Sequence, residues 1–192
     1  FALGVACCGC ATPPPTQEQL SSGLIWMFPG VEGGEWLLHG PRRAFRDAGV
    51  KSAIHTHKWR YPLGILPNLM DHKGNTEDAV QVAQQIDHYQ QQYPGRPIDL
   101  VGYSGGGGLA IMVAERLPEN VHLRNVVLVH PALSRDYDLT GALSRIDGKL
   151  VNFCSSRDWF MLGIGTWIFG TIDRVHTVSA GKDGFNPEVA IS

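Results

Sequence analysis

Residues 97–117 read PIDLVGYSGGGGLAIMVAERL, and the change of pattern within this stretch decides the fold. Residues 97–101 predict a buried strand, and residues 106–117 predict a helix in spite of the leading glycines. The Gly-Tyr-Ser-Gly-Gly sequence of residues 102–106 joins the two. A Gly-x-Ser-x-Gly sequence at a strand-to-helix junction predicts a sharp turn that exposes its serine, here Ser104.

The turn requires glycine on both sides of Ser104 for a steric reason. In so sharp a turn the residues two before and two after the serine nearly touch, and here they are Gly102 and Gly106. The serine itself takes a strained backbone conformation that lifts its hydroxyl above the sheet. The following helix directs its N-terminus at that hydroxyl, which favours negative charge developing there. Ser104 is therefore the candidate nucleophile.

The rest of the chain alternates strands with helices. Short apolar runs predict further strands at residues 23–28, 51–56, 125–130 and 149–154. Helices are predicted at residues 41–48 and 76–93, the second with Asn75 or Thr76 as its cap. This alternation predicts an α/β fold, a mostly parallel sheet with helices on both faces.

The composition is that of a globular protein. The chain has 192 residues, of which 43% are hydrophobic and 18% charged, and this fits a single domain. Its formal net charge is −2, so the surface offers no general attraction for phosphates and no nucleic-acid partner is expected. No run of about 18 apolar residues occurs, so no complete transmembrane helix is predicted.

Residues 1–22 are predicted to lie outside the domain, which spans residues 23–192. The chain begins FALGVACCGC, typical of the end of a signal peptide, and a linker rich in Pro, Thr, Gln and Ser follows. The small residues before Cys7 resemble the site of lipid attachment in bacterial lipoproteins, with Cys8 and Cys10 as competing sites. We expect a cell-envelope or secreted protein, with membrane attachment through an N-terminal lipid. A cytoplasmic location is the alternative.

The glycine-rich segment has two other interpretations. Residues 105–110 match the Gly-x-Gly-x-x-Ala form of a dinucleotide-binding loop. Such a loop expects an acidic residue about 20 positions later, at the end of the next strand. The chain has Val129, His130 and Pro131 there. A tightly packed glycine turn without chemistry is the other alternative. No nucleotide cofactor is expected.

A metal site is also considered and not expected. His55 and His57 share one face of a predicted strand, as two metal ligands would. The metallo-hydrolase pattern needs Asp-His after them, and Lys58-Trp59 stands there instead. The N-terminal cysteines lack a second cluster with ligand spacing. Cys154, inside an apolar run, is expected to be a small core residue.

From residue 23 to at least Asp158, these features resemble the α/β-hydrolase superfamily. The resemblance implies an oxyanion hole made of two backbone N–H groups, one in the loop after the first strand and one directly after the serine. That loop reads FPGV at residues 28–31, with Pro29 in the place of the superfamily's His. The two donors correspond to Val31 and Gly105. An ordinary flexible loop is the alternative.

The resemblance further implies an acid that follows a later strand. Asp158 follows the strand predicted at residues 149–154 and would orient a histidine and stabilise its cation. Capping a helix is the alternative role for Asp158. Asp136 and Asp147 fit less well, because neither directly follows a strand.

The general base should be a histidine that follows the last strand. His176 is the histidine that follows Asp158, but it falls within the strand predicted at residues 173–180 and not after it. We therefore expect the base to be a histidine beyond Ser192, with His176 as the alternative, and the domain to lack its C-terminal end. His130 precedes the acid. The remaining histidines are expected on the surface: His39, His72, His88 and His122.

Together, the serine and the resemblance imply a serine hydrolase. Such an enzyme transfers an acyl group from a small ester to Ser104 and then to water, without a cofactor or metal. Thioester or amide cleavage on the same scaffold is an alternative, and so is a non-catalytic, envelope-anchored binding protein. The connection between residues 130 and 149 has room for about two helical turns, so an open site without a large lid is expected.

Overall fold

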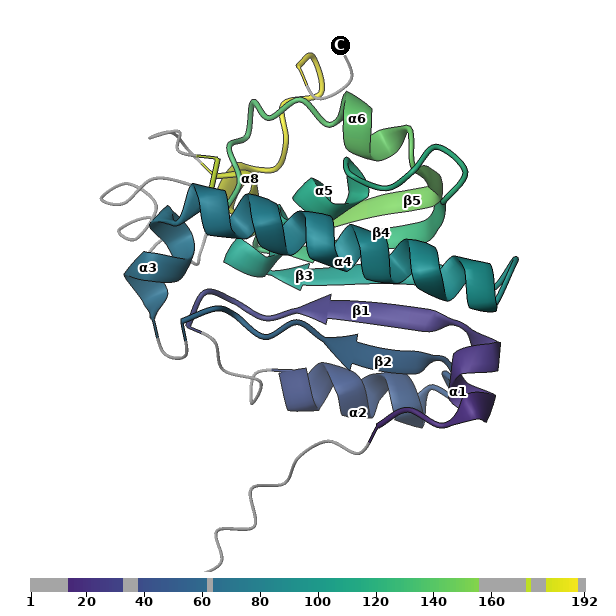
Figure 1. The fold of residues 1–192 in the computed structure, drawn as a ribbon. Helices are drawn as coiled ribbons and strands as arrows, with labels where there is room; N and C mark the ends of the chain where they lie inside the picture. The colour runs from purple at the N-terminus through teal and green to yellow at the C-terminus, as the bar shows by residue number, and fades with distance from the viewer. Residues whose placement is uncertain (1–13, 33–37, 62–63, 156–171, 174–178, 190–192) are drawn as a thin grey trace, which may run out of the picture.

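Five strands of the described residues form one parallel sheet (Figure 1). The computed structural model describes residues 14–32, 38–61, 64–155, 172–173 and 179–189. In the order β2-β1-β3-β4-β5, the strands are β1 (Leu24–Phe28), β2 (Ala53–Thr56), β3 (Ile98–Tyr103), β4 (Leu123–Val129) and β5 (Ile146–Phe153). Because the strands are parallel, their carboxyl ends meet at one edge, where Phe28 pairs with Gly102.

Helices cover both faces of this sheet. The described helices are α1 (Gln17–Ser22), α2 (His39–Asp47), α3 (Ile65–Met70), α4 (His72–Gln92), α5 (Gly105–Ala114), α6 (Thr140–Leu143) and α8 (Ala180–Asp183). α4 and α5 pack on the face that carries Trp26 and Phe28, and α2 packs on the face that carries Ile25 and Met27. Successive residues of β1 thus enter two cores, which is why the whole strand is apolar. The predicted α/β architecture is confirmed.

The long helix α4 begins earlier than the sequence predicts. Its cap is Asp71, whose carboxylate accepts a hydrogen bond from Gly74 N at 2.9 Å, and not Asn75 or Thr76. Asn75 is instead buried inside the helix, where its side chain donates to Asn68 O at 2.8 Å. Gly74 disfavours helix, so the sequence pattern did not indicate that the first turn of α4 is helical. The cap by Asp71 and the packing of this turn stabilise the helix there.

The segment expected to be a linker contains a helix. Thr16 and Gln19 form a reciprocal capping box at the start of α1. Tyr89 Oη of α4 donates to Leu20 O at 2.7 Å, and Tyr93 Oη donates to Gln17 Oε1 at 2.7 Å. α1 is therefore attached to the domain through two tyrosines of α4.

Cys154 is exposed, and the expectation of a buried core residue was wrong. Among the described residues β5 is an edge strand of the sheet, so its side chains are less covered than those of the central strands, and Phe153 is also 57% exposed. The apolar run KLVNFC indicated a strand correctly but did not indicate that the strand lies at an edge.

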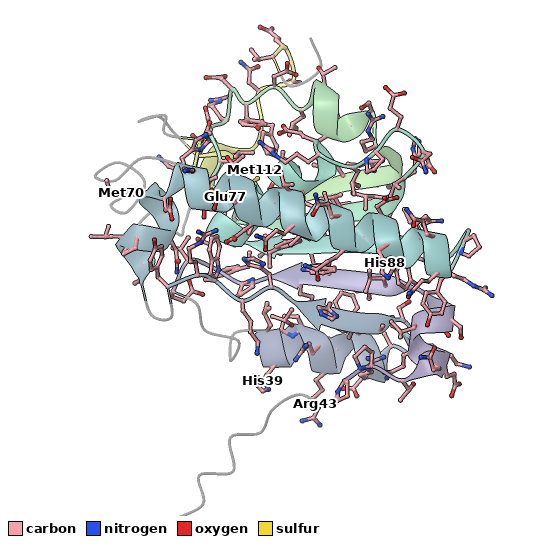
Figure 2. The ribbon with its side chains drawn as sticks, in the orientation of Figure 1. His39, Arg43, Met70, Glu77, His88 and Met112 are labelled. Carbon is pink, nitrogen blue, oxygen red and sulfur yellow. The ribbon has the colours of Figure 1, made fainter. Side chains whose placement is uncertain are left out.

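The outer surface carries the histidines predicted there. His39, His72, His88 and His122 are all exposed, and Figure 2 shows His39 on α2 and His88 on α4.

Between β4 and β5 the connection contains the four-residue helix α6, in keeping with the short connection expected from the sequence. Among the described residues, no helix is long and apolar enough to cross a membrane.

Candidate active site

Ser104 occupies the turn between β3 and α5 and has an unusual backbone conformation. Its φ is 52° and its ψ is −125°, in a region that residues with a side chain rarely adopt. The surrounding backbone holds this conformation: Ser104 N donates to Val129 O at 3.0 Å, and Ser104 O accepts from Gly107 N and Ala132 N, each at 2.9 Å. The hydroxyl does not cap α5, although serine commonly caps helices.

Gly102 and Gly106 approach each other as the sequence argument requires. A Cβ atom on Gly102 would lie 2.6 Å from Gly106 O and 2.8 Å from Gly107 N, closer than real side-chain carbons come. Gly106 has a second constraint, because a Cβ atom there would overlap the carbonyl oxygens of Phe28 and Pro29. The turn therefore packs against the end of β1 as well as against itself.

Gly107 and Gly108, the last two glycines of the run, also lie where a side chain would not fit. A Cβ atom on Gly107 would lie 2.8 Å from the Cβ of Pro131, and one on Gly108 would overlap Ile172 and lie 3.3 Å from a methyl group of Leu133. Each glycine inside a helix costs about 1 kcal/mol relative to alanine. Packing within the chain explains why α5 tolerates that cost, and no bound phosphate is needed to account for the glycines.

The loop that follows β1 (residues 29–31, the β1 loop) packs directly on this turn. Val31 is buried, and its side chain fills the space that a Cβ atom on Gly105 would need. The peptide nitrogen of Val31 lies 3.8 Å from the same Cβ position. The two residues expected to supply oxyanion donors therefore lie next to each other, beside the N-terminus of α5.

Two buried side chains hold the carbonyl groups of the β1 loop. Trp59 Nε1 donates to Pro29 O at 3.0 Å, and Asn68 Nδ2 donates to Val31 O at 2.8 Å. Trp59 is 6% exposed and Asn68 is 1% exposed. Neither residue could be selected from the sequence, because a tryptophan after a strand and an asparagine in a short helix carry no pattern that indicates a contact with a distant loop.

His55 and His57 share one face of the sheet, as predicted, and both pack on aromatic rings of β1. The ring of His55 lies 4.8 Å from that of Trp26, and the ring of His57 lies 5.7 Å from that of Phe28 and 5.4 Å from that of Trp59. Burial lowers the pKa of His57, so the neutral ring is favoured. Among the described residues, no group of three or more potential ligands is placed to hold a metal ion.

Glu32 follows the β1 loop and is partly buried. Its carboxylate fills the space that a side chain on Gly30 would need, and among the described residues Oε1 has no hydrogen-bond partner. Burial raises the pKa of this carboxyl above its ordinary value of 4.5.

Several predicted site residues lie outside the described residues. These are Asp158, His176 and the cysteine proposed for lipid attachment, Cys7. Asp147 lies away from Ser104, since it pairs with His122 at 2.9 Å near the amino ends of the strands. Asp136 accepts a hydrogen bond from Asn186 at 3.0 Å.

A hollow of about 540 Å³ lies at the opposite, amino-terminal edge of the sheet, lined in part by Arg96, His122 and Arg124. Two of these side chains pair with neighbours: Arg124 Nε donates to Asp99 at 3.0 Å, and His122 pairs with Asp147. Ser104 lies at the other edge, so this hollow has no part in the candidate site.

Comparison with known proteins supports the architecture. No protein-family model matches the chain. The crystal structure of esterase PE8 superposes with a TM-score of 0.53 at 14% identity, covering 69% of this chain and 67% of that one. The chain has the α/β-hydrolase fold. An uncharacterised protein from Bacillus cereus superposes on this α/β-hydrolase fold with a TM-score of 0.52 at 13% identity, covering 74% of this chain and 47% of that one.

A sequence relative matches part of this chain. Mouse monoglyceride lipase is 35% identical over 72 residues, which is 38% of this chain and 23% of the lipase. The chain therefore matches less than a quarter of that curated relative's length.

Proposed function

We propose that this protein hydrolyses esters through a covalent acyl-enzyme at Ser104. The observation that carries the proposal is the conformation of Ser104, with φ of 52° at a junction between β3 and α5. A strained serine whose hydroxyl does not cap its helix is typical of a nucleophile presented at the top of a parallel sheet.

The proposed reaction uses groups that converge at this edge. Ser104 Oγ attacks the carbonyl carbon while a histidine takes the hydroxyl proton, and the carbonyl oxygen becomes an anion. The N–H groups of Val31 and Gly105 stabilise that anion, aided by the positive end of α5. The histidine then gives the proton to the leaving alkoxide. A water molecule repeats the sequence on the acyl-enzyme and releases the acid.

The remaining triad members are assigned from the superfamily resemblance. Asp158 would orient the histidine, and the histidine is His176 or one beyond Ser192. The proposed reaction calls for no cofactor, since proton transfer and backbone donors suffice for acyl transfer.

An apolar surface beside the β1 loop favours a substrate with an acyl or alkyl group. α3 is joined to the loop through Asn68 and exposes Ile65, Leu66 and Met70 by 54%, 40% and 57%. Figure 2 shows Met70 projecting at the end of the molecule toward which β1 and β3 point. Such side chains remove apolar groups from water, so a small acyl ester is the preferred substrate class.

Labelling of the complete protein with a fluorophosphonate tests the proposal, because the reagent reacts with an activated serine. We expect labelling and hydrolysis of p-nitrophenyl butyrate, both abolished by Ser104→Ala. Ser144→Ala, which removes an exposed hydroxyl at the end of α6, is the matched control and should change neither.

The same assay separates the alternatives. If Ser104 is labelled but thioester or amide analogues are turned over faster than esters, the substrate is a thioester or an amide. An unlabelled wild-type protein would contradict the enzymatic proposal and favour a non-catalytic binding protein.

A further inference from the structure

The β1 loop has a specific hydrogen-bonding pattern. Three peptide groups run through it in succession, and the outer two have their carbonyls bound by side chains. Pro29 O accepts from Trp59 Nε1 at 3.0 Å, and Val31 O accepts from Asn68 Nδ2 at 2.8 Å. The middle peptide, between Gly30 and Val31, carries the N–H group assigned to the oxyanion.

Peptide geometry explains why this pattern matters. Each peptide unit is planar, so fixing the carbonyl of Pro29 and the carbonyl of Val31 fixes the planes on both sides of the middle peptide. Gly30 lacks a side chain and would otherwise allow that peptide to rotate with little resistance. The direction of the Val31 N–H then depends on the two bound carbonyls.

We propose that Trp59 and Asn68 are positioning residues that hold the Val31 N–H in the direction needed to stabilise the oxyanion. The inference rests on the proposed function, since it assigns the Val31 N–H to the transition state. Neither side chain is assigned a contact with substrate. Both act through the backbone of the β1 loop.

Asn68 is suited to this role because both the nitrogen and the oxygen of its side-chain amide form hydrogen bonds. Nδ2 donates to Tyr61 O at 2.8 Å as well as to Val31 O, and Oδ1 accepts from Tyr61 N at 3.2 Å. The backbone carbonyl of Asn68 accepts a hydrogen bond from Asn75 Nδ2 at 2.8 Å, which links α3 to α4. A carboxylate in place of the amide would lose both donors.

Trp59 is held by packing as well as by its hydrogen bond. His57 contacts its ring edge-on, with an interplanar angle of 84°. The neutral form favoured for His57 suits this buried contact. The indole ring is thereby oriented so that its N–H reaches Pro29 O.

Trp59→Phe in the complete protein removes the N–H donor and keeps most of the ring. We expect kcat to fall about tenfold to a hundredfold with KM nearly unchanged, because the oxyanion is stabilised in the transition state and not in the bound substrate. The matched control is Trp26→Phe. Trp26 is equally buried, but among the described residues its Nε1 has no hydrogen-bond partner. The kcat of Trp26→Phe should stay at the wild-type value.

Asn68→Ala supplies a second, independent variant. We expect the same loss of kcat at nearly constant KM, together with a lower melting temperature. Asn125→Ala is its control, because Asn125 donates to Asp99 and accepts from Lys149 N at the opposite edge of the sheet. That control should lower the melting temperature without lowering kcat once the protein is folded.

Wild-type kcat in folded Trp59→Phe and Asn68→Ala would overturn the positioning role while leaving the serine mechanism intact. An equal loss of kcat in Trp26→Phe or Asn125→Ala would also overturn it, because the effect would then follow from general destabilisation. The proposed function itself fails separately, if the wild-type protein neither hydrolyses esters nor reacts with the fluorophosphonate.

Discussion

The side chain of Val31 fills the space in which a Cβ atom on Gly105 would have to lie. These residues come from different segments, the loop after β1 and the first turn of α5. Their close packing fixes the distance between the two N–H groups that we assign to the oxyanion. The absence of a side chain at residue 105 is therefore required by the neighbouring loop and not by the turn around Ser104.

Replacing Gly105 by alanine should separate the two donors. The new methyl group would push Val31 away, and we expect kcat to fall by about a hundredfold or more, as when one oxyanion donor is lost. Overpacking should also lower the free energy of unfolding by about 1–3 kcal/mol. Stopped-flow or steady-state hydrolysis and urea unfolding measure the two effects.

Gly40→Ala is the control for that substitution. Gly40 lies in α2, and no atom lies within 4 Å of the position of its added Cβ. Alanine in a helix is favoured over glycine, so stability should rise by up to about 1 kcal/mol with unchanged activity. Full activity in Gly105→Ala would show that the contact with Val31 does not position a donor.

The strain at Ser104 predicts a large difference in stability between two substitutions of this residue. Glycine accepts a φ of 52° more readily than alanine does, so Ser104→Gly should be more stable than Ser104→Ala by about 1 kcal/mol or more. Glycine is also preferred to alanine at an ordinary helix N-cap, so the difference at Ser104 should exceed the one between Thr16→Gly and Thr16→Ala, where Thr16 caps α1 with a φ of −77°. His130, with φ of 49°, offers a parallel comparison of glycine with alanine. Equal thermal stability of Ser104→Gly and Ser104→Ala would mean that the turn stores no strain.

Much of this architecture could be predicted because its signals are local. The strand at 98–103, the glycines on both sides of Ser104 and the helix that follows are adjacent in the sequence, so steric reasoning over a few residues was enough. The parallel sheet followed from apolar strands that alternate with helices.

The features that the sequence did not indicate depend on contacts between segments that are distant in the chain. Trp59 and Asn68 reach Pro29 and Val31 across about 30 residues or more, and no periodicity encodes such a hydrogen bond. The expected burial of Cys154 was wrong for a similar reason, because the order of the strands, which places β5 at an edge among the described residues, is not encoded locally.

The exposed side chains of α3 predict that, among small acyl esters, KM falls as the acyl chain lengthens. Replacing Ile65 and Met70 by serine should raise KM for longer p-nitrophenyl esters by roughly fourfold for each methylene group that loses its contact, and leave the acetate ester unaffected. Val80→Ser on α4 is the control, because Val80 is also 40% exposed but lies on a different helix. An identical chain-length profile in wild type and the α3 double variant would contradict an acyl-binding role.

Burial of His57 predicts a loss of stability on acidification. Its pKa lies below the ordinary value of 6.5, so the unfolded chain binds a proton at pH values where the folded protein does not. Stability from this residue is therefore complete above 6.5 and decreases as the pH falls below it, by at most about 1.4 kcal/mol per pH unit. Glu32 and Glu115 act in the opposite direction, because burial raises their pKa above 4.5 and the folded state then binds protons more readily.

His57→Phe isolates the histidine from these opposing groups, since it keeps a ring against Phe28 and Trp59 but cannot bind a proton. Urea unfolding at pH values on both sides of 6.5 should show a steeper acid decline in the wild-type protein than in His57→Phe. His39→Gln changes an exposed histidine on α2 and should keep the wild-type slope. Parallel stability curves for the wild type and His57→Phe would mean that His57 is protonated as readily in the folded protein as in the unfolded chain, and that the ring contact with Trp59 does not require the neutral form.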